Sequence, residues 1–566
     1  MTELFDLEEL RMELPPSGGF VNGNTILVKN HSTIGDNGGG VFMWRTGSAF
    51  ESGPYSFENY GTIVKSYQVP LNTGSWVRQY NGFINVLFFG AFGYGVNYTE
   101  EIQRAIDFAK TNAELNPQVK SSTVYLPNGS YVLDNIILKS GIDIIGESLE
   151  NTNIYATEGD GTSNDYLFTI ESGRMVINIS NLNIIGVRTI EGQAIYTRKG
   201  CFKFEATLNN LGGGGLTYSN IKNIQIRFFK QNGIYLKGGS GSVKSRVNQF
   251  NVFENVRIVR HGDGLFSYDN HALKMFGQNG QHSFINCQFD GFHFNEDEIT
   301  VYDRGINVMI ENGGDVTTNV ATFLNCTFQE ADYGIIIKQA ENVTIDNCWF
   351  EYLGVAITVQ GNAGLNPEEL IPSKSINILN NRFANASGFG SIDAPHNIKD
   401  GQCVSVESSV VNVYDNFVTA SYPELVNPKS LFVYGFPMNY GLNVYGNTFR
   451  KDHINLRRCF GVKQDLLVDS SFTLFCQSNK LVFVITDDMN PITDIKRIES
   501  SINPGEMLTI RCETKLLTFY NVDNIFLTNR LTFQLTIGEI ATFVKMDIGN
   551  DNETYQLVSF VKTTPP

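Results

Sequence analysis

The hydrophobic pattern in the middle of the chain repeats as a six-residue phrase. It consists of an apolar residue, any residue, Asn, a small or apolar residue, any residue, and an apolar residue. The copies are ISNLNI (179–184), IKNIQI (221–226), FENVRI (253–258), FINCQF (284–289), FLNCTF (323–328), IDNCWF (345–350) and ILNNRF (378–383), followed by the degenerate VYDNFV (413–418) and VYGNTF (444–449). The shortest interval between the recurring Asn residues is 22 residues. This series is typical of a solenoid whose coils carry insertions at one corner.

Each phrase predicts two short strands joined by a sharp bend, because apolar residues alternate both before and after the Asn. Asn tolerates the left-handed backbone that such a bend needs, and stacked Asn side chains can bond to one another along the solenoid axis. A third strand begins at a glycine after several phrases, as in GIYL (233–236), GINVMI (305–310), GIIIK (334–338) and GVAITV (354–359). Three strands per coil predict an all-β chain built as a right-handed, three-stranded parallel β-helix.

The flanking segments predict three domains. Residues 99–109 (TEEIQRAIDFA) predict an amphipathic helix with a Thr N-cap, suited to cover the open first coil with Ile102, Ala105, Ile106 and Ala109. After about residue 455 the phrase stops, and strands separated by polar turns follow. We therefore expect an N-terminal β-module at 1–85, a β-helix at 86–455, and a C-terminal β-domain for trimerisation or carbohydrate binding at 456–566.

Composition narrows the classes of ligand. The net charge of −16 argues against nucleic acid, whose binding rests on Lys and Arg neutralising phosphates. No run of about 20 apolar residues predicts insertion into a membrane, and no signal peptide is visible. The eight cysteines have no CxxC pair or metal-ligand spacing, so we expect buried thiols of a protein made in a cytoplasm. The histidines lack zinc-like spacing, and we expect neither a metal nor a cofactor.

Residues 86–147 resemble the opening of the pectate-lyase-like β-helix superfamily found in many phage and prophage tailspikes. The matching elements are FGAFGYG (89–95), the predicted helix, YLPNGSY (125–131) and IIGES (144–148), although Asn97 and Tyr98 stand where the family usually has Asp-rich residues. Upstream, DNGGGVFMW (36–44), NYGTIV (59–64) and GSWVRQY (74–80) resemble the short N-terminal module of tailspike depolymerases directed at Acinetobacter capsules.

This resemblance implies a homotrimer in the virion tail, made in the cytoplasm of the phage's host. It also implies a bacterial capsular or surface polysaccharide as receptor and substrate, and an endo-acting glycosidase. The partner on the virion is expected to be a baseplate or tail adaptor protein. Because the matching module begins within the first 20 residues, we expect a separate virion anchor to be absent from this chain.

Carboxylates gather at equivalent positions of successive coils, which stack about 4.8 Å apart. The residue directly after each phrase gives one column, which consists of Asp290, Gln329 and Glu351 and is expected to face outward because the preceding Phe faces inward. The residue two before the glycine of the next strand gives a second column, which consists of Asp303, Asp332 and Tyr352. Glu330 shares its turn with Asp332. The predicted catalytic residues are therefore Glu330, Asp332, Glu351, Asp303 and Asp290.

Clustered carboxylates suit acid/base chemistry, because like charges separate their pKa values. Glycoside hydrolysis needs two of them, about 5 Å apart for retention or roughly 6.5–9.5 Å apart for inversion, and the sequence leaves both open. The residues expected to bind sugar through aromatic or cationic side chains are Trp349, Tyr352, Lys338, Arg304 and Lys274. Two alternatives stay open: a polysaccharide lyase, in which the acids could be Ca²⁺ ligands, and a non-catalytic glycan-binding trimeric fibre.

Overall fold

The fold was analysed in a computed structural model. It describes residues 2–16, 19–115, 122–159, 165–190, 193–196, 200–209, 212–239, 246–260, 271–291, 294–296, 299–301, 305–311, 319–361, 372–384, 402–407, 409–419, 431–435, 441–445, 447–449, 462–465, 473–476, 481–485, 494–500, 507–512, 516–521, 525–527, 532–536, 539–547 and 553–561.

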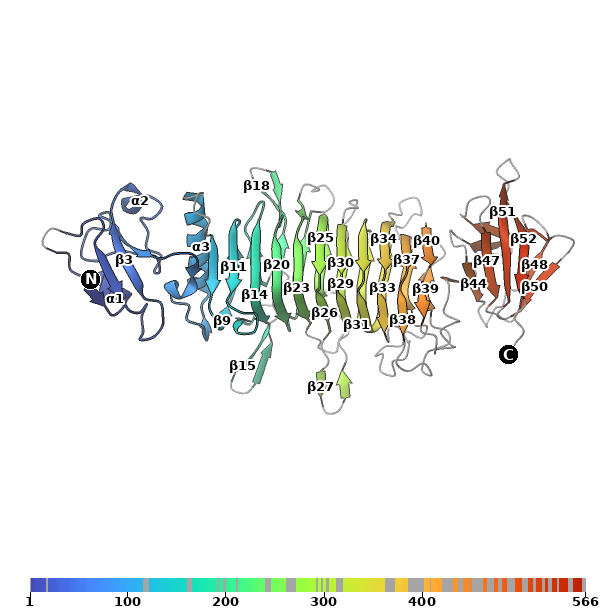
Figure 1. Cartoon of the computed structure of the whole chain (residues 1–566), viewed down its shortest axis with the longest axis horizontal. Helices are drawn as coiled ribbons and strands as arrows, with labels where there is room; N and C mark the ends of the chain where they lie inside the picture. The colour runs from blue at the N-terminus through green and yellow to red at the C-terminus, as the bar shows by residue number, and fades with distance from the viewer. Residues whose placement is uncertain are drawn as a thin grey trace.

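Parallel strands stacked coil upon coil form the body of the molecule (Figure 1). In the middle coils, β30 (Asn319–Leu324) pairs with β32 (Val343–Asp346), and β31 (Thr327–Lys338) pairs with β33 (Trp349–Gln360), all in parallel. Both β31 and β33 turn a corner and supply two of the three strands of their coil. This arrangement confirms the predicted all-β parallel β-helix.

The recurring Asn residues adopt the predicted left-handed backbone. Their φ angles lie between 52° and 59° at positions 181, 223, 255, 286, 325, 347 and 380, and Asp415 in a degenerate phrase has φ 54°. Nδ2 of Asn255 donates to Oδ1 of Asn223 at 3.1 Å, and Nδ2 of Asn347 donates to Oδ1 of Asn325 at 2.7 Å. The bends are thus joined along the axis by side-chain hydrogen bonds.

Side-chain ladders of one residue type fill the interior. Phe289, Phe328, Phe350 and Phe383 stack at centroid distances of 4.8 to 5.2 Å. The position after the bend is Cys in three consecutive coils and then becomes Asn, and the buried Nδ2 of Asn381 donates to Oδ1 of Asn416 at 3.0 Å. Within the coils that it spans, each ladder places the same side chain at equivalent positions, which helps to hold neighbouring coils in register.

Helix α3 (Thr99–Leu115) covers the first coil, and its buried residues are the predicted Ile102, Ala105, Ile106 and Ala109. The predicted Thr cap is wrong. The Thr99 hydroxyl donates to Oδ1 of Asn97 at 2.7 Å and accepts from the Asp134 N–H, while Asn97 Oδ1 also accepts from the Thr99 N–H. The hydroxyl therefore joins the helix start to the first coil.

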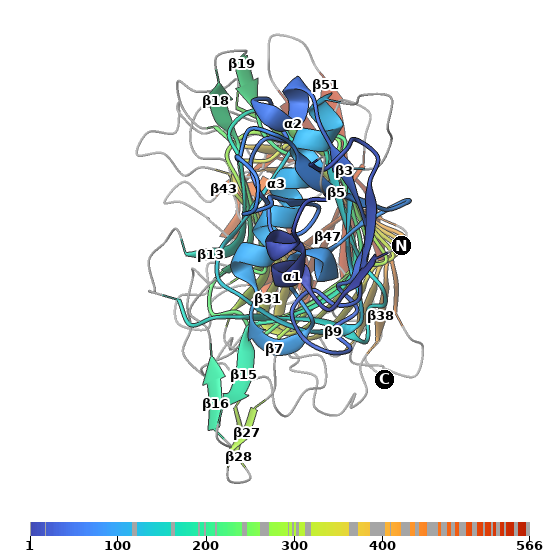
Figure 2. The ribbon, with the colours of Figure 1, turned by 90° about the vertical axis from the view of Figure 1, so that its left-hand side faces the viewer.

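Two β-hairpins extend from one side of the β-helix, seen end-on in Figure 2. The first pairs β15 (Val187–Ile190) with β16 (Gln193–Tyr196), and the second pairs β27 (Phe294–Glu296) with β28 (Ile299–Val301). Both are insertions at the corner that follows the second half of a phrase, so they rise from the same edge of the solenoid.

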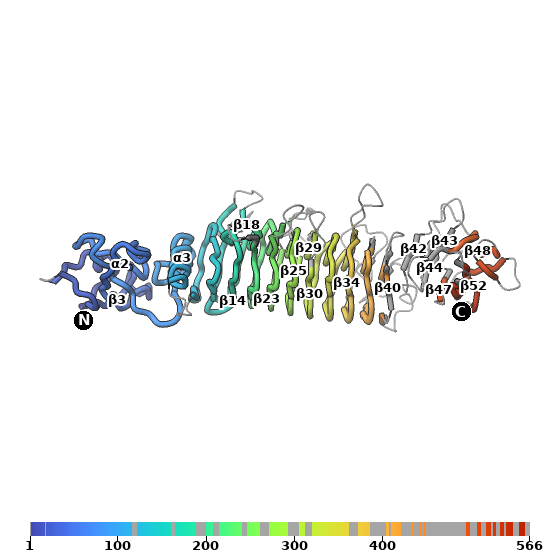
Figure 3. The backbone as a smooth tube through the Cα atoms, turned by 90° about the horizontal axis from the view of Figure 1, so that it is seen from above, coloured from blue at the N-terminus to red at the C-terminus, as the bar shows by residue number. Residues whose placement is uncertain are grey.

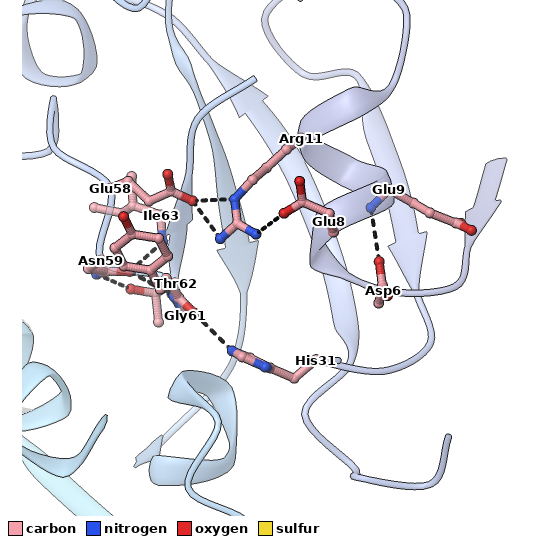
Figure 4. A network of polar contacts seen from close by, with 11 residues as sticks. Asp6, Glu8, Glu9, Arg11, His31, Glu58, Asn59, Gly61, Thr62 and Ile63 are labelled. Atoms are coloured by element: carbon pink, nitrogen blue, oxygen red, sulfur yellow. Dashed lines mark hydrogen bonds and ion pairs between the residues drawn. The ribbon is translucent and has the colours of Figure 1, made fainter. Parts of the chain in front are cut away.

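The N-terminal segment forms its own five-stranded sheet, with Trp44 and Trp76 packed in a separate core. Seen from above, it lies beyond α3 at one end of the solenoid (Figure 3). In Figure 4, Arg11 pairs with Glu8 and Glu58 at 2.8 Å, and His31 Nε2 lies 3.0 Å from the Tyr60 carbonyl. The sheet order is β1 (Thr2–Leu4), β2 (Thr25–Val28), β3 (Gly40–Arg45), β5 (Ser75–Gln79) and β4 (Ile63–Val64).

The C-terminal segment has a further core and antiparallel pairing of β47 (Met507–Cys512) with β51 (Ile540–Asp547) and of β51 with β52 (Glu553–Val561). Parallel pairing nevertheless continues past residue 455, from β39 (Leu431–Gly435) to β42 (Val462–Asp465), β44 (Leu481–Ile485) and β47. The division at residues 85 and 455 stays a prediction.

Candidate functional site

The second half of each phrase presents two side-chain columns to the outside of the β-helix. We call them together the outer stripe. Its first column comes from the fifth phrase position, in the order Asn183, Gln225, Arg257, Gln288, Thr327, Trp349, Arg382, Phe417 and Thr448. Its second column comes from the residue after the phrase, in the order Ile185, Arg227, Val259, Asp290, Gln329, Glu351, Ala384 and Thr419. The predicted stacking of Asp290, Gln329 and Glu351 is therefore present in the register.

Asp290 is the most deeply placed acid of the stripe, with only 4% of its surface exposed. The side chain lies in the outward column as predicted, but other residues cover it, so it does not face solvent. Arg257, from the preceding coil, directs both Nε and Nη2 to its Oδ2 at 3.3 Å. Burial raises the pKa of Asp290 to about 6, although Arg257 opposes this shift, and the nearby charge of Glu330 adds to it. Asp290 is thus a carboxyl that changes its charge close to neutral pH.

Glu330 occupies the corner directly after the stripe, with φ 57°. Its counterpart on the next coil is Tyr352, with φ 51°, because Gln329 pairs with Glu351 and Ala331 pairs with Leu353. Burial and the nearby charge of Glu351 raise the pKa of Glu330, and Arg257 opposes them. Glu330 therefore holds its proton to a higher pH than an ordinary glutamate.

Glu351 is held by two donors that converge on one oxygen. Nε1 of Trp349 lies 3.1 Å from Oε2, and Nε2 of Gln329 in the preceding coil lies 3.2 Å from the same atom. The other carboxylate oxygen, Oε1, receives neither of these donors. The two contacts fix the direction of this half-buried carboxylate beside Glu330.

The fold with these features matches solved structures of tailspike proteins. The enzymatically active domain of tailspike protein 2 from bacteriophage CBA120 superposes with a TM-score of 0.52 at 14% identity, over 79% of this chain and 56% of that one. The chain has the parallel β-helix fold of this tailspike domain. The full-length form of the same Escherichia coli phage protein gives a TM-score of 0.50 at 14% identity, over 82% of this chain and 51% of that one.

Tailspike gp49 of the Acinetobacter baumannii phage Fri1, described as a capsular polysaccharide depolymerase, gives a TM-score of 0.49 at 13% identity, over all of this chain and 92% of that one. This chain spans about half the length of the CBA120 tailspike structures. No family model and no curated protein matches the sequence.

The strand pairing shows that the predicted second acid column has the wrong register. The sequence aligned the strands by their glycines, which set Asp332 beside Tyr352. The strands instead pair at a constant offset, so Asp332 falls beside Gly354, and Gly334 falls beside Ala356. Asp332 is also buried, with 7% of its surface exposed. The glycines do not mark equivalent positions, because Gly334 and Gly354 stand at different points along strands that pair without a register shift.

The remaining predicted residues lie in different places. Tyr352 is 48% exposed at the corner beside Glu330. Lys338 ends β31 nine positions beyond Gln329 and pairs with Gln360. Lys274 lies on β24 (His271–Phe276), and its Nζ is 5.7 Å from the ring centroid of Tyr235. The register does not bring either lysine to the acids. Asp303 and Arg304 lie outside the described residues.

Trp349 differs from the free sugar platform that the sequence predicts. Its indole N–H is engaged by Glu351, and the Arg382 guanidinium carbon lies 4.4 Å from its ring centroid. The half-buried ring therefore positions Glu351 and supports a cation on one face.

The sequence reasoning missed Arg257, the cation that acts on both Asp290 and Glu330. A signal for it existed, since Arg257 stands at the fifth position of FENVRI, where Trp349 stands in IDNCWF. Aligning the phrases by this position would have shown the whole first column of the stripe.

The described residues contain no group of three or more His, Cys, Asp or Glu side chains placed to hold a metal ion. In this part of the chain, no helix has the length and apolar character needed to span a membrane. The arrangement pairs Glu330, whose pKa is raised, with Glu351, whose carboxylate is oriented by two donors. Such a pair can perform acid/base chemistry on a bound substrate.

Proposed function

We propose that the chain is a tailspike-type enzyme that depolymerises a bacterial surface polysaccharide by hydrolysing its glycosidic bonds. The observation that carries this proposal is the pairing of Glu330 with Glu351 on neighbouring coils, where the charge of Glu351 helps raise the pKa of Glu330. Glycosidases use such a pair, one carboxyl protonated and the other ionised. The match to the enzymatically active domain of the CBA120 tailspike supports the fold on which the pair stands.

In this mechanism Glu330 donates its proton to the glycosidic oxygen of the leaving sugar. Glu351 acts from the other side, either on the anomeric carbon or on the water that attacks it, with its direction held by Trp349 and Gln329. Their backbone positions are one coil and one residue apart, about 4.8 and 3.3 Å in the two directions. Two glutamate side chains can therefore reach both sides of one glycosidic bond.

Asp290 and Arg257 complete the electrostatics of the site. The charge of Glu330 helps raise the pKa of Asp290, and Arg257 opposes the rise in pKa at both carboxyls. Because Asp290 is nearly covered, we assign it to the support of Glu330 rather than to contact with sugar.

The wider setting is also part of the proposal. The enzyme would act as a homotrimer in the virion tail, docked through a baseplate or tail adaptor protein, with the polysaccharide as host receptor. Light scattering of the purified chain tests the trimer, since a mass near 63 kDa would show a monomer instead.

Treatment of purified capsular polysaccharides from a panel of bacterial strains tests the chemistry. Hydrolysis releases reducing ends from at least one polysaccharide, and mass spectrometry shows that each oligosaccharide weighs the sum of its sugar residues plus one water, because one water is added for every bond cleaved. A lyase would leave an unsaturated uronate that absorbs ultraviolet light. A fibre that only binds would release no reducing ends from any member of the panel.

A further inference from the structure

The outer stripe carries a second charged group on the N-terminal side of the acids. Arg227 ends β20 (Asn220–Arg227), and Arg257 lies near the end of β23 (Val252–Val259), the next strand of the stack. Gln225 pairs with Arg257, and Arg227 follows Gln225 by two residues on the same outer face. Arg227 is therefore the diagonal neighbour of Arg257. Two guanidinium groups thus face outward side by side, in a chain whose net charge is −16.

The carboxylates around these arginines are too few to neutralise both. Arg257 is 49% exposed and shares Asp290 Oδ2 through two contacts of 3.3 Å. Within the described part of the chain, Arg227 has no ion pair. Its Nη2 donates to Oδ1 of Asn183 at 3.2 Å, and its Nε–H is buried without a hydrogen-bond acceptor.

The surroundings of Arg227 are unfavourable for a lone cation. Partial burial and the charge of Arg257 both lower the pKa of Arg227, while Tyr155 opposes them. Asn183 is itself held by a 2.6 Å hydrogen bond from its Nδ2 to Asn153, so the guanidinium is oriented rather than free to turn into solvent. A bound anion would relieve the repulsion between the two guanidinium groups.

We infer that Arg227 and Arg257 form a subsite for the carboxylate of an acidic sugar, so that the polysaccharide is one with uronate or similar anionic units. Guanidinium forks match the planar carboxylate, and a pair of them makes a short-range positive site that the distant negative charge of the chain does not cancel. This inference rests on the proposed function, because it places the acidic unit on the same stripe as the cleavage site.

The register sets the position of the acidic unit relative to the cut. Arg227, Val259, Asp290 and Gln329 follow one another in one column, so Arg227 lies three strand spacings, about 14 Å, from the coil of Glu330. An extended glycan lying along the stripe would therefore hold its anionic unit away from the reacting bond. The arginines bind and align the chain, and the glutamates cleave it.

Binding, measured on the Glu330→Gln variant, tests the subsite without cleavage. The probes are the purified capsular polysaccharides of the panel, each acidic member also in a carboxyl-reduced form, in which every uronate carboxylate has become a primary alcohol. We expect calorimetry to show binding of at least one acidic polysaccharide and at least about tenfold weaker binding of its reduced form. Adding Arg227→Gln and Arg257→Gln should produce the same loss.

Lys222→Gln is the matched control, since Lys222 lies on the same strand β20, on the other side of the Asn223 bend. It removes one positive charge from the same strand as Arg227 and should leave binding unchanged. Equal binding of native and reduced polysaccharide, full binding by the arginine variant, or binding of no acidic member overturns the subsite. If the wild-type chain releases no reducing ends but still binds the acidic polysaccharide more tightly than its reduced form, the proposed hydrolysis is overturned and the subsite is not.

Discussion

Trp349 and Glu351 stand two residues apart on one strand and share its outer face, and the indole N–H of Trp349 donates to Oε2 of Glu351 at 3.1 Å. Gln329 donates to the same oxygen at 3.2 Å from the coil before. The Glu351 carboxylate is therefore positioned by its own strand and by its neighbour together. Both donors lie on the outside of the solenoid, and we propose that they position Glu351 for catalysis.

Trp349→Phe should lower kcat by roughly 10- to 100-fold, with KM changed much less. A smaller aromatic ring remains beneath Arg382, and the hydrogen bond to a charged group is lost, which is worth about 1.5–3 kcal/mol. Initial rates of reducing-end release on the degraded polysaccharide measure the effect. The control is Glu254→Gln, on the outer face of β23 before its bend, which should be nearly silent. An equal loss in both variants would contradict the positioning role.

Glu330→Gln and Glu351→Gln should each reduce the rate by at least the roughly 10²–10⁴-fold typical of one general acid or base. The amide keeps the shape of the side chain but neither donates an acidic proton nor accepts one. Melting temperatures should stay close to that of the wild type, because both residues lie outside the core. Full activity in both variants would move the catalytic site to another face.

Asp332→Asn separates the corrected register from the one predicted by the glycines. Asp332 is buried beside Gly354, whereas Glu330 shares the corner with Tyr352. We expect Asp332→Asn to lower stability and to keep at least a tenth of the wild-type kcat at a temperature where it is folded. A loss of kcat as large as that of Glu330→Gln, with unchanged melting, would restore Asp332 as a catalytic candidate.

Asp290 should impose a pH dependence on stability. Its folded-state pKa of about 6 lies above the ordinary 3.8, so the folded protein binds the proton more tightly than the unfolded chain. The resulting contribution is fully present below about pH 3.8 and is lost as the pH rises through 6, a change of roughly 3 kcal/mol. Asp290→Asn should remove this slope from unfolding free energies measured between pH 4 and 7. Asp415→Asn, at an exposed bend, is the control and should leave it in place.

The sequence was sufficient to predict the β-helix because the same six-residue phrase recurs from coil to coil. Each Asn bend is flanked by alternating apolar residues, and the structure places the Asn residues in the left-handed conformation from 181 to 380. The cap helix followed from its own 3.6-residue period, and its four predicted residues are the buried ones. The Thr99 hydroxyl was misassigned because its partners, Asn97 and the Asp134 N–H, are set by packing on the first coil.

The site was predictable only where register could be read from the phrase. Asp290, Gln329 and Glu351 follow their phrases directly, so their stacking was correct. Asp332 was displaced because the glycine before the third strand is not a fixed landmark. The burial of Asp290 was not visible in the alternation, since residues beyond the phrase cover an outward side chain without changing its pattern.

The Asn bends provide the last prediction, which concerns the backbone of the fold. Asn347 has φ 52° and donates to Asn325 Oδ1 at 2.7 Å. Asn347→Gly and Asn347→Val both remove this hydrogen bond, but only Val brings a β-branched side chain into the left-handed region, which costs roughly 1–2 kcal/mol. We therefore expect Val to destabilise the protein by at least that much more than Gly, measured as unfolding free energy in guanidinium. Equal destabilisation by Gly and Val would show that the hydrogen-bond ladder, and not the left-handed backbone, is what makes Asn the repeated residue.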